Sequence, residues 1–242
     1  MNMHHYGLEV DKLQSLIATP THHDTAYGTH GVVAEADDYR LERWFVKSGE
    51  TLSLTIEAGR ELTLFVEDGL VGVGDEEVAK HKQITLAPGT TIEFLAKSDS
   101  ALYGFSGLID ESSLTSGYRI ASPDDYRDKY WGSIQTMVNA IYTGKRLFFG
   151  RGQHSSLHFH CNKLEHYYIH TGKLLVRLRA GRGEDRLFTL NQGDTLLIPP
   201  GLMHQDGGLE DTVIIEVSTH DVDSDSFIVE DGATMEMPGF GS

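Results

Sequence analysis

Several features are scarce in this sequence, and each scarcity argues against a class of protein. Cys161 is the only cysteine among 242 residues, so the chain cannot form an internal disulfide, which fits a reducing compartment. No apolar run approaches the roughly 20 residues that a membrane-spanning helix needs. The first residues lack a basic segment followed by an apolar one, so no signal peptide is expected. We therefore predict a cytoplasmic protein without a membrane partner.

Basic residues are also scarce, which bears on the choice of partner. The chain has 20 lysines and arginines against 36 aspartates and glutamates, a formal net charge of -16. Phosphate backbones attract basic clusters, and none is visible, so nucleic acid is not expected as a partner. There is also no Walker loop, no dinucleotide GxGxxG after a strand and no GxSxG elbow. The expected partner is a small-molecule substrate.

Long helical periodicity is the next scarce feature. A short helix is predicted over residues 8–18 and another over 123–131, where Pro123 can occupy the first turn. Elsewhere short alternating or apolar segments are separated by glycine; examples are 51–58, 62–69, 91–96, 173–180, 195–200 and 212–218. Many short strands with glycine-rich turns predict an all-β sandwich or barrel.

A weak internal repeat relates the two halves of the chain. Residues 49–69 align with 152–172, and each leads from a turn glycine through an alternating strand, a polar corner and a second strand to another glycine. We predict two related β-domains. Their expected bounds are 31–115 for the first and 116–242 for the second, after an N-terminal extension over 1–30. The second includes an acidic C-terminal tail.

The most informative segment is 157–172, which carries two alternating histidines and a glutamate. His158 and His160 project from the same face of a strand, and a hairpin can return Glu165 beside them. His204, after a second glycine-bounded strand and a tight turn, can supply a third imidazole. Three imidazoles and a carboxylate suit one divalent ion of Mn, Fe, Co, Ni or Zn. On an octahedral ion, two positions stay open for substrate.

The first copy of the repeat lacks these ligands. Thr55, Glu57 and Leu62 align with the two histidines and the glutamate, so the first domain is not expected to hold a metal. The alternative for the second copy is a strand with polar side chains and structural histidines.

The spacing of these residues resembles the cupin superfamily. Its first motif, G-x5-H-x-H-x4-E-x6-G, is matched by Gly152, His158, His160, Glu165 and Gly172. Its second, G-x5-P-x-G-x2-H, is matched by Gly193, Pro199, Gly201 and His204. The resemblance implies an all-β fold of two jelly-roll, or double-stranded β-helix, barrels. It places a metal in the C-terminal barrel, on His158, His160, Glu165 and His204, and implies a degenerate N-terminal barrel.

Two further residues suggest a reaction. Lys163 lies between two of the ligands, where a dication would disfavour its charged form and help it act as an acid or base. The alternative is a surface lysine at a hairpin corner. Glu216 stands inside the apolar strand 213–218, where a carboxylate is costly unless it is paired or catalytic. The alternatives for Glu216 are an outward orientation or a pairing with Arg177.

The pattern HxHxxKxE, with the downstream segment 216–227, looks like the D-lyxose isomerase group of cupins. That group interconverts aldoses and ketoses through a cis-enediol, with Mn or a similar ion that polarises the carbonyl. The resemblance implies an enzyme in which Glu216 is the base and Lys163 its acid/base partner, with Mn favoured as the metal.

Weaker indications concern substrate contacts. The segment 144–160 resembles cupins associated with sugar 6-phosphates and sugar nucleotides, in which Lys145, Arg151 or Gln153 could contact substrate. Tyr167 shares a strand face with Glu165, so it lines the pocket or belongs to the core.

Two other functions stay open at this point. One is a cupin dioxygenase that uses Fe, Ni or Cu with the same four ligands, and the other is a non-catalytic carbohydrate-binding cupin. We also expect a homodimer, because unclosed sheets have edges that need covering.

Overall fold

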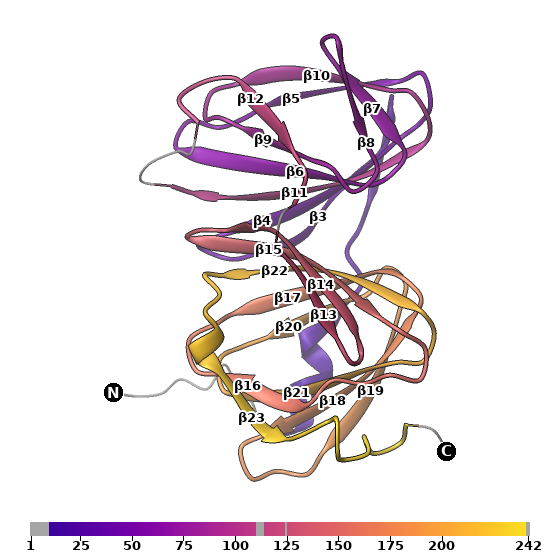
Figure 1. Ribbon diagram of the computed structural model, residues 1–242, viewed down its shortest axis with the longest axis vertical. Coiled ribbons are helices and arrows are strands. Elements are labelled where there is room, and N and C mark those ends of the chain that lie inside the picture. The colour runs from indigo at the N-terminus through magenta and orange to yellow at the C-terminus, as the bar shows by residue number, and fades with distance from the viewer. Residues whose placement is uncertain (1–9, 110–113, 124, 241–242) are drawn as a thin grey trace. The chain divides into compact units, whose positions relative to one another are not determined.

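The computed structural model describes residues 10–109, 114–123 and 125–240, and their regular secondary structure is almost entirely β-strand (Figure 1). This confirms the predicted all-β class. Two short 3-10 helices accompany the strands, η1 (Val10–Leu16) and η2 (Asp223–Asp225). The first falls within the helix predicted over 8–18, of which residues 8 and 9 lie outside the described residues. No helix in the described ranges is long and apolar enough to cross a membrane.

The chain divides into two compact units. One comprises residues 20–125 and 136–144, here called the first unit. The other comprises 1–19, 126–135 and 145–242, here called the second unit.

The first unit contains a large and a small antiparallel sheet. The strands are β2 (His23–Thr25), β3 (Gly28–Glu35), β4 (Arg40–Val46), β5 (Thr51–Thr55), β6 (Arg60–Asp68), β7 (Leu70–Val73), β8 (Glu76–Ala79), β9 (Gln83–Leu86), β10 (Thr91–Ala96), β11 (Ser100–Leu108) and β12 (Tyr118–Ala121). The large sheet has the order β12-β9-β6-β11-β4-β3-β2, and the small one has the order β5-β10-β7-β8. Both sheets contribute side chains to one core, so they pack face to face.

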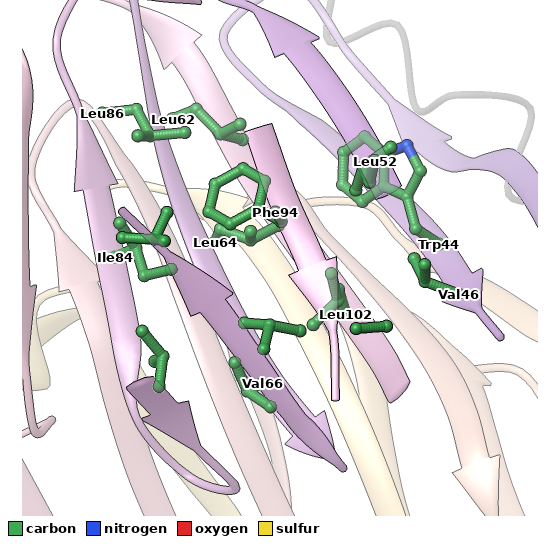
Figure 2. Packing of buried hydrophobic residues seen from close by; sticks show 14 of the residues in the cluster. Trp44, Val46, Leu52, Leu62, Leu64, Val66, Ile84, Leu86, Phe94 and Leu102 are labelled. Atoms are coloured by element: carbon green, nitrogen blue, oxygen red, sulfur yellow. The ribbon is translucent and has the colours of Figure 1, made fainter. Parts of the chain in front are cut away.

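Apolar side chains form the core of the first unit. Figure 2 shows Trp44, Leu52 and Phe94 packed together with aliphatic side chains from both sheets. Thr55 and Glu57 are exposed, whereas Leu62 belongs to this core. The described residues of this unit include no group of metal-ligating side chains comparable to the one described below. Of the three positions that align with the predicted ligands, only Leu62 therefore packs into this apolar core.

The second unit also has two antiparallel sheets. The strands of these sheets are β1 (Ile17–Ala18), β13 (Asp125–Lys129), β14 (Gly132–Asn139), β15 (Tyr142–Phe149), β16 (Leu157–His160), β17 (Glu165–Thr171), β18 (Lys173–Ala180), β19 (Arg186–Asn191), β20 (Thr195–Ile198), β21 (Leu202–Gly208), β22 (Thr212–Thr219) and β23 (Ser226–Glu230). Three of them include residues of the first unit, namely 125 in β13, 136–139 in β14 and 142–144 in β15. The orders are β1-β20-β17-β22-β15-β14-β13 and β19-β18-β21-β16-β23. Apolar side chains from both sheets fill one part of the interior, and polar side chains fill the other.

The N-terminal segment is built into this second unit. Leu13 of η1 is fully buried in its core, and β1 pairs with β20 through Ile17 and Leu196. Thr19 Oγ1 donates a hydrogen bond of 2.7 Å to Asp194. The local pattern of residues 8–18 does not indicate this pairing, because the partner strand lies far along the sequence.

The helix predicted over 123–131 is wrong. Residues 125–129 form β13, an edge strand beside β14, and residue 124 lies outside the described residues. The turn between the two strands ends at Gly132, whose φ of 152° is readily adopted only by glycine. A Cβ there would overlap the carbonyl oxygen of Phe148. Strand pairing through this turn outweighs the local preference for a helix.

Candidate metal centre

Three histidines meet inside the second unit. His158 and His204 are direct cross-strand partners on β16 and β21, and their ring centroids are 4.2 Å apart. His160 follows two residues later on the same face of β16, with ring centroids 5.2 Å from His158 and 5.8 Å from His204. One ring nitrogen of each lies within 4.8 Å of those of the other two. The three predicted imidazoles therefore form a group that can hold a metal ion.

Backbone carbonyls orient all three rings, because each carbonyl oxygen faces the Nδ1 atom of one histidine. Nδ1 lies 3.0 Å from Ser156 O in His158, 2.9 Å from Asp225 O in His160 and 3.2 Å from Leu202 O in His204. A carbonyl only accepts, so each Nδ1 donates its hydrogen. Each Nε2 then carries the lone pair that a metal requires.

Burial keeps two of these imidazoles neutral. It lowers the pKa of His158 to about 3, with a further contribution from His204. Burial likewise lowers the pKa of His204 to about 4, although the charge of Glu165 opposes the shift. Neutral imidazole is the form that binds metals.

Glu165 completes the predicted ligand set at the start of β17. It lies outside the compact three-histidine group, but its Oε1 is 3.2 Å from His204 Nε2 and 3.7 Å from His160 Nε2. Glu165 Oε1 and His204 Nε2 are both buried without a hydrogen-bond partner among the described residues. Buried polar atoms without partners are rare, so these two fit a cation between them.

Lys163 lies at the centre of a buried ion-pair cluster. Its Nζ is 2.6 Å from Glu165 Oε2, 2.7 Å from Glu216 Oε1 and 3.3 Å from Asp221 Oδ1. The side chain is buried, so the alternative of a surface lysine is wrong. Burial by itself lowers the pKa of Lys163, but the three carboxylates raise it well above its usual value. Without a dication, the protein favours the charged form that we expected a metal to disfavour.

Glu216 points toward the same cluster from β22. It is paired in register with Tyr167, is only 2% exposed and also lies 3.9 Å from Lys145 Nζ. Arg177 instead binds Glu230 at 2.6 Å and Gln205 at 3.0 Å. The alternatives of an outward Glu216 or one paired with Arg177 are therefore wrong.

The structure separates the predicted substrate contacts. Lys145 Nζ on β15 lies 2.5 Å from Asp221 Oδ2, at the margin of the cluster. Tyr167 is buried with its ring 6.3 Å from that of His204. Gln153 instead lines a hollow of about 510 Å³ with Arg151, and none of the three histidines lines it. Lys145 and Tyr167 thus accompany the candidate centre, whereas Gln153 faces a different space.

Two carboxylates of this region were missed from the sequence. Asp221 binds both lysines; burial raises its pKa, but Lys163 and Lys145 together lower it to about 2. Asp206 is 2% exposed, receives the Tyr167 hydroxyl at 3.5 Å, and its Oδ1 has no hydrogen-bond partner among the described residues. Strand alternation offered a signal for Asp206, because His204 and Asp206 share one face of β21.

Asp206 makes stability depend on pH in a predictable direction. Burial, followed by the charges of Glu165 and Glu216, raises its pKa to about 8 from a usual value of 3.8. A carboxyl with a raised pKa stabilises the fold most below its unfolded pKa, and this contribution is lost as the pH rises through the folded pKa.

We therefore expect metal-free Asp206→Asn protein to gain stability relative to wild type as the pH rises from about 4 to about 8. Urea denaturation at a series of pH values measures the difference. Asp223→Asn, which changes an aspartate side chain that is 82% exposed, is the control and should follow wild type. If the free energies of unfolding of Asp206→Asn and wild type changed in parallel with pH, the raised pKa of Asp206 would be contradicted.

Comparison with known proteins identifies the fold. Over 88% of both chains, the structure matches a formate complex of Lactobacillus farciminis oxalate decarboxylase with a TM-score of 0.68 and 11% identity. A variant of Bacillus subtilis oxalate decarboxylase matches over 85% of this chain and 77% of its own, with a TM-score of 0.66 and 12% identity. The chain therefore has a bicupin fold, as the motifs indicated.

The sequence comparisons match a smaller part of the chain than the structural ones do. No protein-family model matches the chain. A mannose-1-phosphate guanylyltransferase of Sinorhizobium fredii is 30% identical over 113 residues, which are 45% of this chain. The match spans only 21% of that relative, about a fifth of its length.

Proposed function

We propose that this chain is a metal-dependent enzyme that interconverts an aldose and a ketose, on a sugar or sugar derivative, through a cis-enediol. The observation that carries the proposal is the buried Lys163–Glu216 pair beside the three histidines. A carboxylate and an ammonium group next to a metal are what proton transfer between neighbouring carbons needs. The partial similarity to a mannose-1-phosphate guanylyltransferase supports a sugar as substrate class.

The residues present fit a divalent metal. His158, His160, His204 and Glu165 would hold it, and Mn is our first choice. Imidazole and carboxylate ligands suit that ion, and Bacillus subtilis oxalate decarboxylase, which shares the fold, has Mn(II) centres. When bound, the ion supplies Lewis-acid polarisation of a substrate carbonyl and a point of attachment for two adjacent oxygens.

Glu216 acts as the base in this proposal. It accepts the proton from C2 of the aldose and returns it to C1 of the ketose. Lys163, held charged by its carboxylates, orients Glu216 and gives a proton to O1 as the enediol forms. It then takes the proton of O2 as the ketose forms, so it ends the cycle charged. Tyr167 and Asp206 offer polar groups to substrate hydroxyls on the same side of the interior.

The charge of the cluster agrees with these roles. Lys145 and Lys163 face three carboxylates, Glu165, Glu216 and Asp221, so the group carries one negative charge in excess. A dication would reverse that excess to a positive one. A positive site stabilises an enediolate, and it would also tolerate a phosphorylated sugar.

Proton NMR in D2O tests the proposal. Manganese-loaded protein is incubated with pentoses, hexoses and their phosphates, and metal-stripped protein is the control. We expect deuterium to appear at C2 of one aldose together with its ketose, only in the loaded sample. If protein that demonstrably holds metal exchanges no proton of any sugar, the isomerase proposal is wrong. Oxygen uptake would then point to the dioxygenase, and sugar affinity alone to a binding cupin.

A further inference from the structure

We propose that Asp225 is a positioning residue of the metal centre, which sets metal affinity and ligand geometry from outside the ligand shell. The inference rests on the metal binding proposed above. It does not depend on the identity of the substrate or on the reaction.

The Asp225 carboxylate clamps the corner between two ligands. Oδ1 accepts hydrogen bonds from the backbone N–H of Cys161 and from Asn162 Nδ2, both at 3.0 Å. Oδ2 accepts from the backbone N–H of Asn162 at 3.0 Å and of Lys163 at 3.1 Å. One side chain thus gathers three consecutive amides of the corner that separates His160 from Glu165.

The backbone of the same residue orients a ligand directly. The Asp225 carbonyl accepts the hydrogen of His160 Nδ1 at 2.9 Å, which leaves Nε2 for the metal. Asp225 is itself held in place, because β23 begins at the next residue and pairs with β16 through Ser226 and His160. The two groups of Asp225 therefore fix both the ring of one ligand and the path of the chain to the next.

The surroundings of Asp225 match this role better than a surface ion pair would. The residue is 6% exposed, and all four donors to its carboxylate are uncharged amides. Four hydrogen bonds to one buried carboxylate fix the corner more firmly than an ion pair between that carboxylate and an exposed lysine would. The preceding loop also delivers Asp221 to Lys163, so residues 221–225 bring two carboxylates to the region.

The physical consequence concerns preorganisation. Without the clamp, the corner at 161–163 must be ordered when the metal binds, and that cost lowers the affinity. Removing a partner that orients a metal ligand typically lowers metal affinity by about 10- to 100-fold. Asn at position 225 would present an NH2 group to backbone N–H donors, so the clamp would lose half of its acceptors.

Metal titration of full-length variants tests the inference. We expect Asp225→Asn to raise the dissociation constant for Mn²⁺ by about 10- to 100-fold and to shift the visible absorption bands of the Co²⁺-loaded protein. The matched control is Asp223→Asn, on the same short helix, whose side chain is 82% exposed and pairs with Arg127. It should leave both readouts unchanged. The free energy of unfolding in EDTA is measured in parallel.

Asn162→Ala is a milder second variant. It removes only one of the four hydrogen bonds to the Asp225 carboxylate, and the side chain that donates this bond is exposed. It should weaken Mn²⁺ binding by a few-fold, and it keeps the inference testable if Asp225→Asn does not fold. Wild-type affinity and an unchanged Co²⁺ spectrum in a folded Asp225→Asn would overturn the inference, even with lower stability. Wild-type protein that binds neither ion would overturn the metal centre itself, and the inference with it.

Discussion

Replacing Glu216 with glutamine is expected to abolish turnover while the metal remains bound. General base catalysis typically contributes 10²- to 10⁴-fold, so we expect a fall of about three orders of magnitude. The amide fills the same space but cannot accept the substrate proton. Glu216 is not among the proposed ligands, and its closest charged contact is Lys163 at 2.7 Å. Metal content and the rate of deuterium exchange on the identified sugar measure the two effects.

Glu210→Gln is the matched control for this experiment. Glu210 is an exposed glutamate whose ion pair with Lys173 spans 3.9 Å, and such pairs contribute little. Its loss should change neither metal content nor turnover. A Glu216→Gln variant with the wild-type exchange rate would show that another group takes the proton. Loss of metal from the variant would instead place Glu216 among the ligands.

The second large effect is expected from His204→Ala. His204 is fully buried, and its Nε2 faces Glu165 Oε1 at 3.2 Å without another partner among the described residues. Removing it deletes a ligand and leaves Glu165 beside an empty space. Changes outside the ligand shell already cost about 10- to 100-fold in affinity, so we expect Mn²⁺ affinity to fall by more than about 100-fold.

Isothermal titration with Mn²⁺ measures that change. His154→Ala is the control, because His154 belongs to the same unit but lines the separate hollow beside Gln153. It should bind Mn²⁺ as wild type does. An unchanged affinity in His204→Ala, with the fold retained, would mean that the metal is held elsewhere.

The proposed ligands could be predicted from the sequence because their spacing carries the geometry. Alternation places His158 and His160 on one face, and the glycine-bounded strand brings His204 opposite His158. The Lys163–Glu216 contact follows less directly from the sequence, since it depends on β22 pairing beside β17. Once that register is formed, the buried carboxylate meets the lysine at the corner.

The contacts that could not be predicted all join distant segments without a spacing rule. Asp225 reaches residues 161–163 only because β23 returns to the edge strand β16. Asp221 lies in an acidic stretch of the sequence, and nothing in the local pattern indicates that two lysines bind it. Local preference also gave the wrong element at 123–131, where pairing with β14 decided the conformation.

The metal centre is tested most directly by titrating metal-stripped wild-type protein with Mn²⁺ and following free Mn²⁺ by electron paramagnetic resonance. We predict saturable binding of one ion per chain, competed by Zn²⁺ and Co²⁺ and lost in His204→Ala. Absence of saturable binding, or several weak sites that persist in His204→Ala, would contradict a metal centre formed by His158, His160, His204 and Glu165.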